Sequence, residues 1–103
     1  MKVTITPGPC KMITTVDVEK KDRKTAIVKV QTNCGFYKPL EDELSEVDVN
    51  SEIFGKLSEG VVYSTCKKYC KHATCPVPCG ILKAIEATFQ LALPTDVTIE
   101  FEK

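Results

Sequence analysis

The sequence predicts a two-layer α+β domain, with a four-stranded, mostly antiparallel sheet and helices on one face. Three segments in the first third of the chain, and one near residue 100, alternate apolar with polar residues, as half-buried strands do. The segments between them repeat apolar residues at helical spacing. The predicted order along the chain is therefore βββ-ααα-β, with room for a fourth short helix.

Length and charge limit the classes of protein to which the chain can belong. Its 103 residues suit one domain, residues 1–103, which buries about 65% of the surface of the unfolded chain. Fourteen basic residues balance fourteen acidic ones, so nothing in the charge attracts nucleic acid or anionic lipid. The start has no signal-peptide core, and no apolar run approaches the ~20 residues that span a bilayer. We expect a cytoplasmic protein that binds neither nucleic acid nor membrane.

The first three strands are predicted from alternation and from the turns between them. Residues 2–6 alternate and lead into the Pro-Gly-Pro turn at 7–9. Residues 12–18 and 26–30 also alternate, and the charged run 20–24 separates them. The second and third strands should therefore form an antiparallel hairpin joined by a solvated turn.

Three shorter helices are expected next, the first two of them with a start signal. Pro39 opens a helix that has Leu40 and Leu44 on its inner side. A second begins at a cap formed by Asn50 or Ser51 and ends near Gly60. A third is expected over residues 62–70, where Cys66 and Cys70 lie four apart on one face and can converge on one ligand.

The longest helix should run from Pro78 to the stop at Pro94, with its apolar positions on one face. Cys75 and Cys79 fall at its N-terminus, where free backbone N–H groups and the helix dipole favour a thiolate. We therefore expect these two thiols to have lowered pKa values. Residues 97–101 alternate again and predict a closing strand with its apolar side chains facing inward.

Six cysteines and one histidine are the candidate functional residues. A reducing compartment and a self-sufficient core argue against a disulfide scaffold and favour metal or redox use. In a two-layer domain, Cys10, Cys34 and Cys75 follow turns or precede a helix at what should be one end of the sheet. With His72 they form a Cys₃His set that suits zinc, and three thiolates alone suit an iron–sulfur cluster.

A competing metal site uses only the local cysteines. It consists of Cys66, Cys70, Cys75 and Cys79, whose spacing is wider than the paired C-x₂-C knuckles of zinc ribbons. Two prolines, Pro76 and Pro78, also stiffen the loop. The mixed site of Cys10, Cys34, Cys75 and His72 is therefore the preferred prediction.

The segment from His72 to Glu86 is distinctive, and it reads His-Ala-Thr-Cys-Pro-Val-Pro-Cys-Gly-Ile-Leu-Lys-Ala-Ile-Glu. With the Leu-Ala-Leu-Pro that ends at Pro94, it resembles the signature of a family of small uncharacterised proteins from anaerobic bacteria and methanogenic archaea. The resemblance covers the whole chain, including Cys10 and Cys34, and carries no assigned reaction. It does not extend to the cysteines at 66, 70 and 79, which again favours the mixed site.

Two looser resemblances also imply metal. The Cys34-Gly35 junction and a cysteine that opens a helix resemble iron–sulfur scaffold proteins of the NifU type, which assemble clusters on three cysteines. The sequence Thr74-Cys75-Pro76 before a helix resembles the TSCPD domain, a small module that carries cysteines. Both are analogies of motif order, which indicate a kind of site more than a function.

The sequence therefore predicts a small cytoplasmic protein that binds zinc or an iron–sulfur cluster, in a non-catalytic or carrier role with an unidentified protein partner. The alternative is a metal-free thiol protein, redox-active through Cys75 and Cys79, or an interaction domain. A catalytic Cys–His pair lacks a third group to orient it, so an enzyme is the weaker expectation. A homodimer is compatible with either reading.

Overall fold

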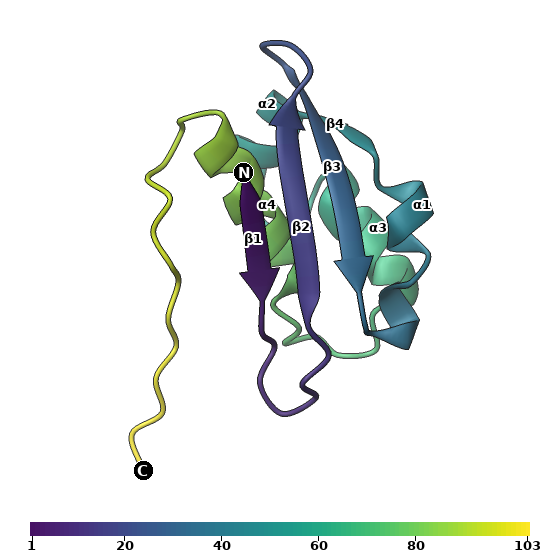
Figure 1. Ribbon diagram of the computed structural model, residues 1–103, viewed down its shortest axis with the longest axis vertical. Coiled ribbons are helices and arrows are strands. Elements are labelled where there is room, and N and C mark those ends of the chain that lie inside the picture. The colour runs from purple at the N-terminus through teal and green to yellow at the C-terminus, as the bar shows by residue number, and fades with distance from the viewer.

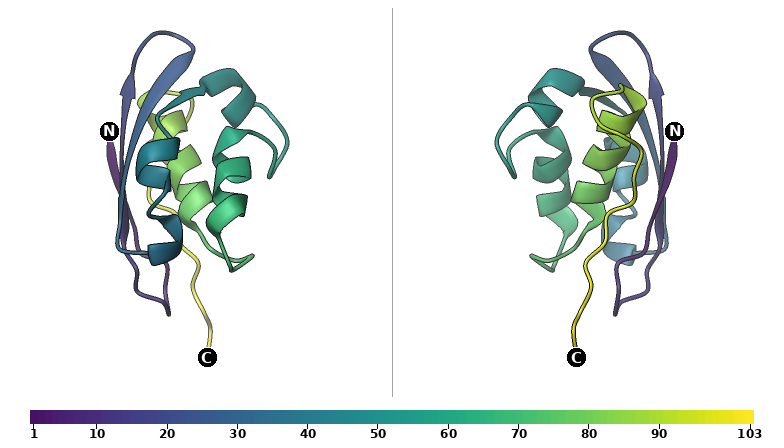
Figure 2. Two further views of the ribbon diagram at one scale, coloured as in Figure 1. Left: turned by 90° about the vertical axis from the view of Figure 1, so that its right-hand side faces the viewer. Right: turned by 90° about the vertical axis from the view of Figure 1, so that its left-hand side faces the viewer.

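A four-stranded antiparallel sheet carries all of the helices on one face in the computed structural model, which describes residues 1–103 (Figures 1 and 2). This two-layer arrangement confirms the predicted α+β class. The strands follow each other across the sheet in chain order: β1 (Lys2–Ile5), β2 (Thr14–Lys20), β3 (Thr25–Thr32) and β4 (Glu46–Asp48).

The predicted hairpin is the centre of the sheet. β2 and β3 pair from Thr14 opposite Thr32 to Lys20 opposite Ala26. At the turn, the Asp22 carboxylate accepts the N–H groups of Lys24 and Thr25, each at 2.9 Å. A turn closed by its own aspartate explains why so charged a run connects two strands.

The helical segments are shorter than their sequence patterns suggest. They are the 3₁₀ helix η1 (Gly35–Tyr37), α1 (Leu40–Glu43), α2 (Val49–Ile53), α3 (Val61–Tyr69) and α4 (Val77–Thr88). The cap predicted at Asn50 or Ser51 is instead Asp48, whose carboxylate accepts the Ser51 N–H at 2.9 Å. α4 ends at Thr88, six residues before Pro94, because the chain turns at Gln90 with a positive φ of 59°.

The position of the fourth strand along the chain was wrongly predicted. Residues 97–101 form no strand and lie in an extended, exposed tail that leaves the body of the molecule (Figure 1). The fourth strand is β4, directly after the segment predicted as the first helix. That helix stops at Glu43 because the chain becomes extended at Leu44, and Val47 then pairs with Ala26 and is buried.

The core lies between the inner face of the sheet and α4. Val16 and Val18 of β2 are fully buried, as are Ile81 and Ile85 of α4. α4 contacts β1 and β2, while α3 packs on α4 from the outside. None of the helices has both the length and the apolar character needed to cross a bilayer.

Candidate thiol site

Three connections that carry cysteines lie at the same end of the molecule (Figure 1). They are the loop between β1 and β2, the segment that follows β3, and the loop between α3 and α4. This placement follows from the topology, because β1 and β3 run toward this end and α3 also finishes there. The thiols in these connections nevertheless have different surroundings.

Cys10 and Cys79 are both exposed, the first in the β1–β2 loop and the second on α4. Cys34 is half-buried and packs against the core. Its N–H donates to Thr32 Oγ1 at 3.0 Å, and its carbonyl accepts the N–H of Tyr37 at 3.0 Å. Cys34 therefore helps to begin η1, the turn that directs Tyr37 into the core.

Tyr37 is the centre of the site. Its side chain is 1% exposed, and its hydroxyl has no hydrogen-bond partner of standard geometry. Burial raises the pKa of this hydroxyl far above its usual value, and the neighbouring thiols of Cys70 and Cys75 raise it further. A buried hydroxyl without a hydrogen-bond partner is uncommon and lowers the stability of the folded protein. The thiols of Cys70 and Cys75 are the polar groups beside it.

The carbonyl of His72 holds Cys70 and Cys75 together. The Cys70 thiol donates to this oxygen at 2.9 Å, and the Cys75 N–H donates to it at 3.3 Å. The His72 N–H also approaches the Cys70 sulfur at 3.4 Å. These contacts with His72 bring Cys70 near enough to Cys75 to raise the pKa of the Cys75 thiol.

Cys66 supplies a third thiol, one turn before Cys70 on α3. It is buried, and this burial raises the pKa of the thiol to about 12, with further increases from the charges of Cys75 and Cys70. We call Cys66, Cys70 and Cys75, together with Tyr37, the thiol cluster. Cys10, Cys34 and Cys79 are not among the main groups that raise the pKa values of Tyr37, Cys66 and Cys75.

The expectation of a lowered pKa at Cys75 was wrong. Burial raises the pKa of the Cys75 thiol, and this effect exceeds the opposing ones of the Tyr37 hydroxyl and the Val77 N–H. The free Val77 N–H at the start of α4 lowers the pKa of the Cys75 thiol, as expected at a helix N-terminus. This effect is smaller than the rise in pKa caused by the loss of water around a half-buried thiol.

One comparison with known proteins places the chain in a family. A family model described as a family of unknown function (DUF6951) matches residues 1–101. The chain belongs to DUF6951. No curated protein and no solved structure matches it. The resemblances to NifU-type scaffolds and to TSCPD domains therefore stay predictions.

The predicted metal sites are not preformed in this DUF6951 protein. No group of three or more His, Cys, Asp and Glu side chains is arranged to hold a metal ion. Residue His72, on which the mixed site depends, is exposed, and only its backbone joins the cluster. Metal binding by Cys10, Cys34, Cys75 and His72 stays a prediction, as does binding by the local quartet.

Sequence reasoning missed Tyr37 and did not group Cys66, Cys70 and Cys75 on their own. Part of the signal was available, because Cys66 is buried on α3 and Cys70, four residues later, caps the end of that helix. Nothing along the chain linked that helix to Tyr37, which lies about thirty residues earlier. Only the packing of α3 beside η1 brings them together.

Proposed function

We propose that this DUF6951 protein is a thiol–disulfide redox protein in which Cys70 and Cys75 form the reactive pair. The observation that carries the proposal is the shared His72 carbonyl, which accepts the Cys70 thiol and the Cys75 N–H and so ties the Cys70 side chain to the Cys75 backbone. A disulfide needs two cysteines whose Cα atoms lie within about 7 Å of each other, and a six-residue segment that folds back on one carbonyl favours that approach. The reducing conditions of the cytoplasm, the compartment expected from the sequence, would keep the pair as thiols at rest.

The two cysteines differ in a way that suits two successive steps. Both thiols are half-buried, but the Cys70 sulfur bonds to the exposed residue His72, on the solvent side of the pair. Burial raises the pKa of the Cys75 thiol, which makes it the slower of the two to ionise. Cys70 is therefore the attacking thiol, and Cys75 is the resolving thiol that completes the exchange.

The exchange balances with a disulfide-bearing partner as the oxidant. The Cys70 thiolate attacks one sulfur of that disulfide, which breaks the S–S bond, forms a mixed disulfide and releases one partner thiolate. Cys75 then attacks the Cys70 sulfur, which forms the Cys70–Cys75 bond and releases the second partner thiolate. The protons lost by the two cysteines end on the two partner thiols, and two electrons pass to the partner.

Tyr37 assists the resolving step as a positioning residue. Its hydroxyl lies beside the Cys75 sulfur and lowers the pKa of that thiol, against the larger effect of burial. A thiolate at Cys75 would give this hydroxyl the acceptor that it otherwise lacks. The cost of leaving the hydroxyl unpaired in the reduced protein is thus recovered when Cys75 ionises.

Disulfide mapping tests the proposal directly. The protein is equilibrated in glutathione buffers of graded potential, its free thiols are alkylated, and it is digested with trypsin. Cleavage at Lys68, Lys71 and Lys83 separates Cys70 from Cys75, so the disulfide appears as Tyr69–Lys71 linked to His72–Lys83. The linked pair should form reversibly and in full at one midpoint potential.

Matched variants assign the sulfurs, because His72–Lys83 also contains Cys79. Cys75→Ser should abolish the linked peptide, whereas Cys79→Ser should leave both its yield and its midpoint potential unchanged. Loss of the link in Cys79→Ser, or free thiols at Cys70 and Cys75 in the most oxidising buffer, would refute the assignment.

A second candidate, the predicted zinc or iron–sulfur protein, is favoured by the third thiol. Cys66 lies near enough to Cys70 and Cys75 for their charges to raise the pKa of its thiol. Thiols are the ligands that soft metals prefer, but these three are not arranged around one point, so a metal would have to draw them together as it binds. In this case the protein would store or carry the metal without catalysing a reaction.

Cys66→Ser separates the two candidates, since a metal site needs this thiol and the Cys70–Cys75 disulfide does not. Protein purified without oxygen is analysed for zinc and iron and by absorption spectroscopy. Metal near one equivalent that is lost in Cys66→Ser would support the second candidate. No metal, together with an unchanged midpoint potential in Cys66→Ser, would support redox function.

A further inference from the structure

The C-terminal tail, residues 93–103, has the pattern of a strand but no partner in its own molecule. Its only backbone hydrogen bond is a local one, from the Thr95 N–H to the Leu93 carbonyl. Every second side chain from residue 97 is apolar and exposed to water: Val97 at 57%, Ile99 at 82% and Phe101 at 81%. Such a regular row of apolar side chains exposed to water requires an explanation.

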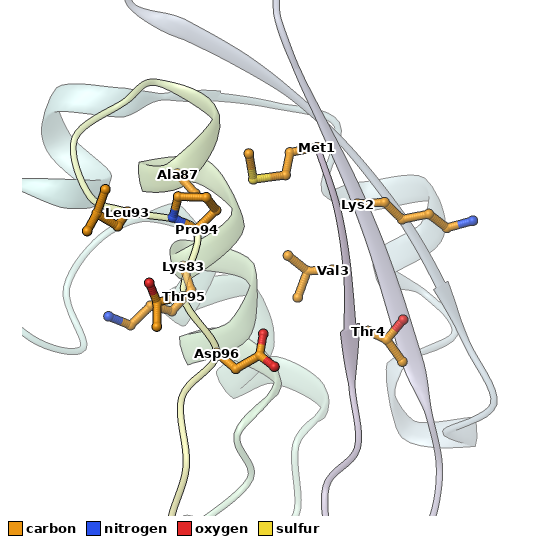
Figure 3. Close-up of a pocket in the computed structure, with 10 residues that line it drawn as sticks. All are labelled: Met1, Lys2, Val3, Thr4, Lys83, Ala87, Leu93, Pro94, Thr95 and Asp96. Atoms are coloured by element: carbon orange, nitrogen blue, oxygen red, sulfur yellow. The ribbon is translucent and has the colours of Figure 1, made fainter.

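The sheet has a free edge at β1, to which a further strand can be added. β1 pairs with β2 on one side only, so the N–H and C=O groups on its outer side have no strand to bind. A groove of about 290 Å³ lies along this edge, between β1 and the beginning of the tail. Figure 3 shows Val3 pointing into this groove, while Lys2 and Thr4 point away from it. An edge of this sort accepts an added strand.

The tail cannot fill this edge in its own molecule. It passes β1 in the same direction, and Asp96 lies level with Thr4, close to the end of the strand (Figures 1 and 3). The groove is lined on the tail side by residues 93–96, which include Pro94 and its missing N–H. Residues 97–101 therefore lie beyond the end of β1, in the part of the tail that runs clear of the sheet (Figure 1).

We propose that the outer edge of β1 binds residues 97–101 of a second copy of this chain, as a fifth strand of the sheet. The same contact made in both directions gives a two-fold symmetric dimer in which each copy donates its tail to the other. Each tail then gains the backbone partners that its own molecule cannot provide. The outer edge of each β1 is covered at the same time.

The two faces of the donated strand match those of β1. Its apolar side chains would lie on the side of Val3, against the groove beside α4. Its polar face carries Glu100 and Glu102 and would lie on the side of Lys2. None of these three charged groups has an ion pair within the monomer, so the contact joins free charges of opposite sign.

Sedimentation equilibrium of the full chain in reductant, which removes intermolecular disulfides, tests the proposal. We expect a reversible dimer, and Ile99→Asp should raise its dissociation constant by at least about tenfold because a buried apolar side chain is replaced by a charge. Thr98→Asp is the matched control, since it places the same charge one residue away on the solvent face. A monomeric full chain, or equal weakening by both variants, would overturn the proposal.

Isotope-filtered NMR distinguishes a second copy from the chain's own β1. In a mixture of ¹³C-labelled and ¹⁵N-labelled protein, Ile99 methyl protons of one copy should show contacts to the Val3 and Thr4 amides of the other. Contacts seen only within one molecule would overturn exchange between copies. Neither result depends on the thiol cluster, so redox function and dimerisation stand or fall separately.

Discussion

Gly80 on α4 lies directly against the side chain of Ile5 on β1. A Cβ at position 80 would overlap Cδ1 and Cγ1 of Ile5, so only glycine allows the two elements to come this close. This contact fixes the beginning of α4 against the end of β1, at the end of the molecule that holds the thiol cluster. A residue with no side chain thus determines how near the last helix lies to the sheet.

Replacing this glycine should loosen the fold. Gly80→Ala introduces a clash within the core that costs about 1–3 kcal/mol, against a gain of about 1 kcal/mol in helix propensity. We expect a net loss of up to about 2 kcal/mol in the free energy of unfolding, measured with urea. Gly35→Ala is the control, because a Cβ there meets no atom within 4 Å. Equal effects of the two substitutions would contradict the packing argument.

Removing the Tyr37 hydroxyl should raise the pKa of the Cys75 thiol without lowering the stability of the fold. Tyr37→Phe deletes a buried group without a partner, so the free energy of unfolding should hold or rise by about 1 kcal/mol. The pKa of the Cys75 thiol should rise, because the hydroxyl lowers it. The pH dependence of alkylation at Cys75 measures this pKa. A lower pKa in Tyr37→Phe would mean that the hydroxyl acts in the opposite sense.

Stability should fall in alkaline solution because of Cys66. The folded protein raises the pKa of this thiol from 9.0 to about 12, so between these values the unfolded chain loses a proton that the folded one keeps. Stability is therefore complete below pH 9 and declines as the pH rises toward 12, with a slope of up to about 1.4 kcal/mol per pH unit. Cys75, whose pKa is also raised, adds to the decline.

Urea unfolding at several values between pH 8 and pH 11 measures this slope. Cys66→Ala removes the thiol that titrates from pH 9, so between pH 9 and pH 10 the variant should lose less stability per pH unit than the parent protein, although it is less stable at pH 7. Parallel curves for the two proteins would show that the decline comes from other groups.

The start of α3 should depend on a carboxylate from α2. Glu52 is buried, and its two oxygens accept the N–H groups of Val61 and Val62, each at 2.7 Å. Glu52→Gln keeps the shape but loses one acceptor and the charge, which should cost about 1–3 kcal/mol. Hydrogen exchange at both amides should accelerate with it. Glu59→Gln, at an exposed position nearby, should change neither quantity.

Much of the fold could be predicted because its signals are local. Alternation identified β1, β2 and β3, and the Asp22 turn between two alternating segments identified the hairpin. The apolar face of α4 was also clear, since Ile81 and Ile85 repeat at helical spacing. Each of these features needs only residues that are neighbours along the chain.

The fourth strand could not be predicted by the same reasoning. Residues 97–101 alternate more regularly than Val47 and its neighbours, yet only the latter lie beside a free edge of β3 within the molecule. The alternation of apolar and polar residues indicates how well a segment suits a sheet. It does not indicate whether the segment can reach a free sheet edge in the folded molecule.

The sequence by itself determined the α+β class, the central hairpin and a concentration of thiols near the start of the last helix. The tertiary structure decided which thiols meet, because Tyr37 and Cys75 come together only where η1 packs beside the end of α3. It also decided the pKa of Cys75, since desolvation depends on everything packed around the sulfur and outweighs the field of one helix end. Burial is a property of the assembled core, and no local pattern along the chain contains it.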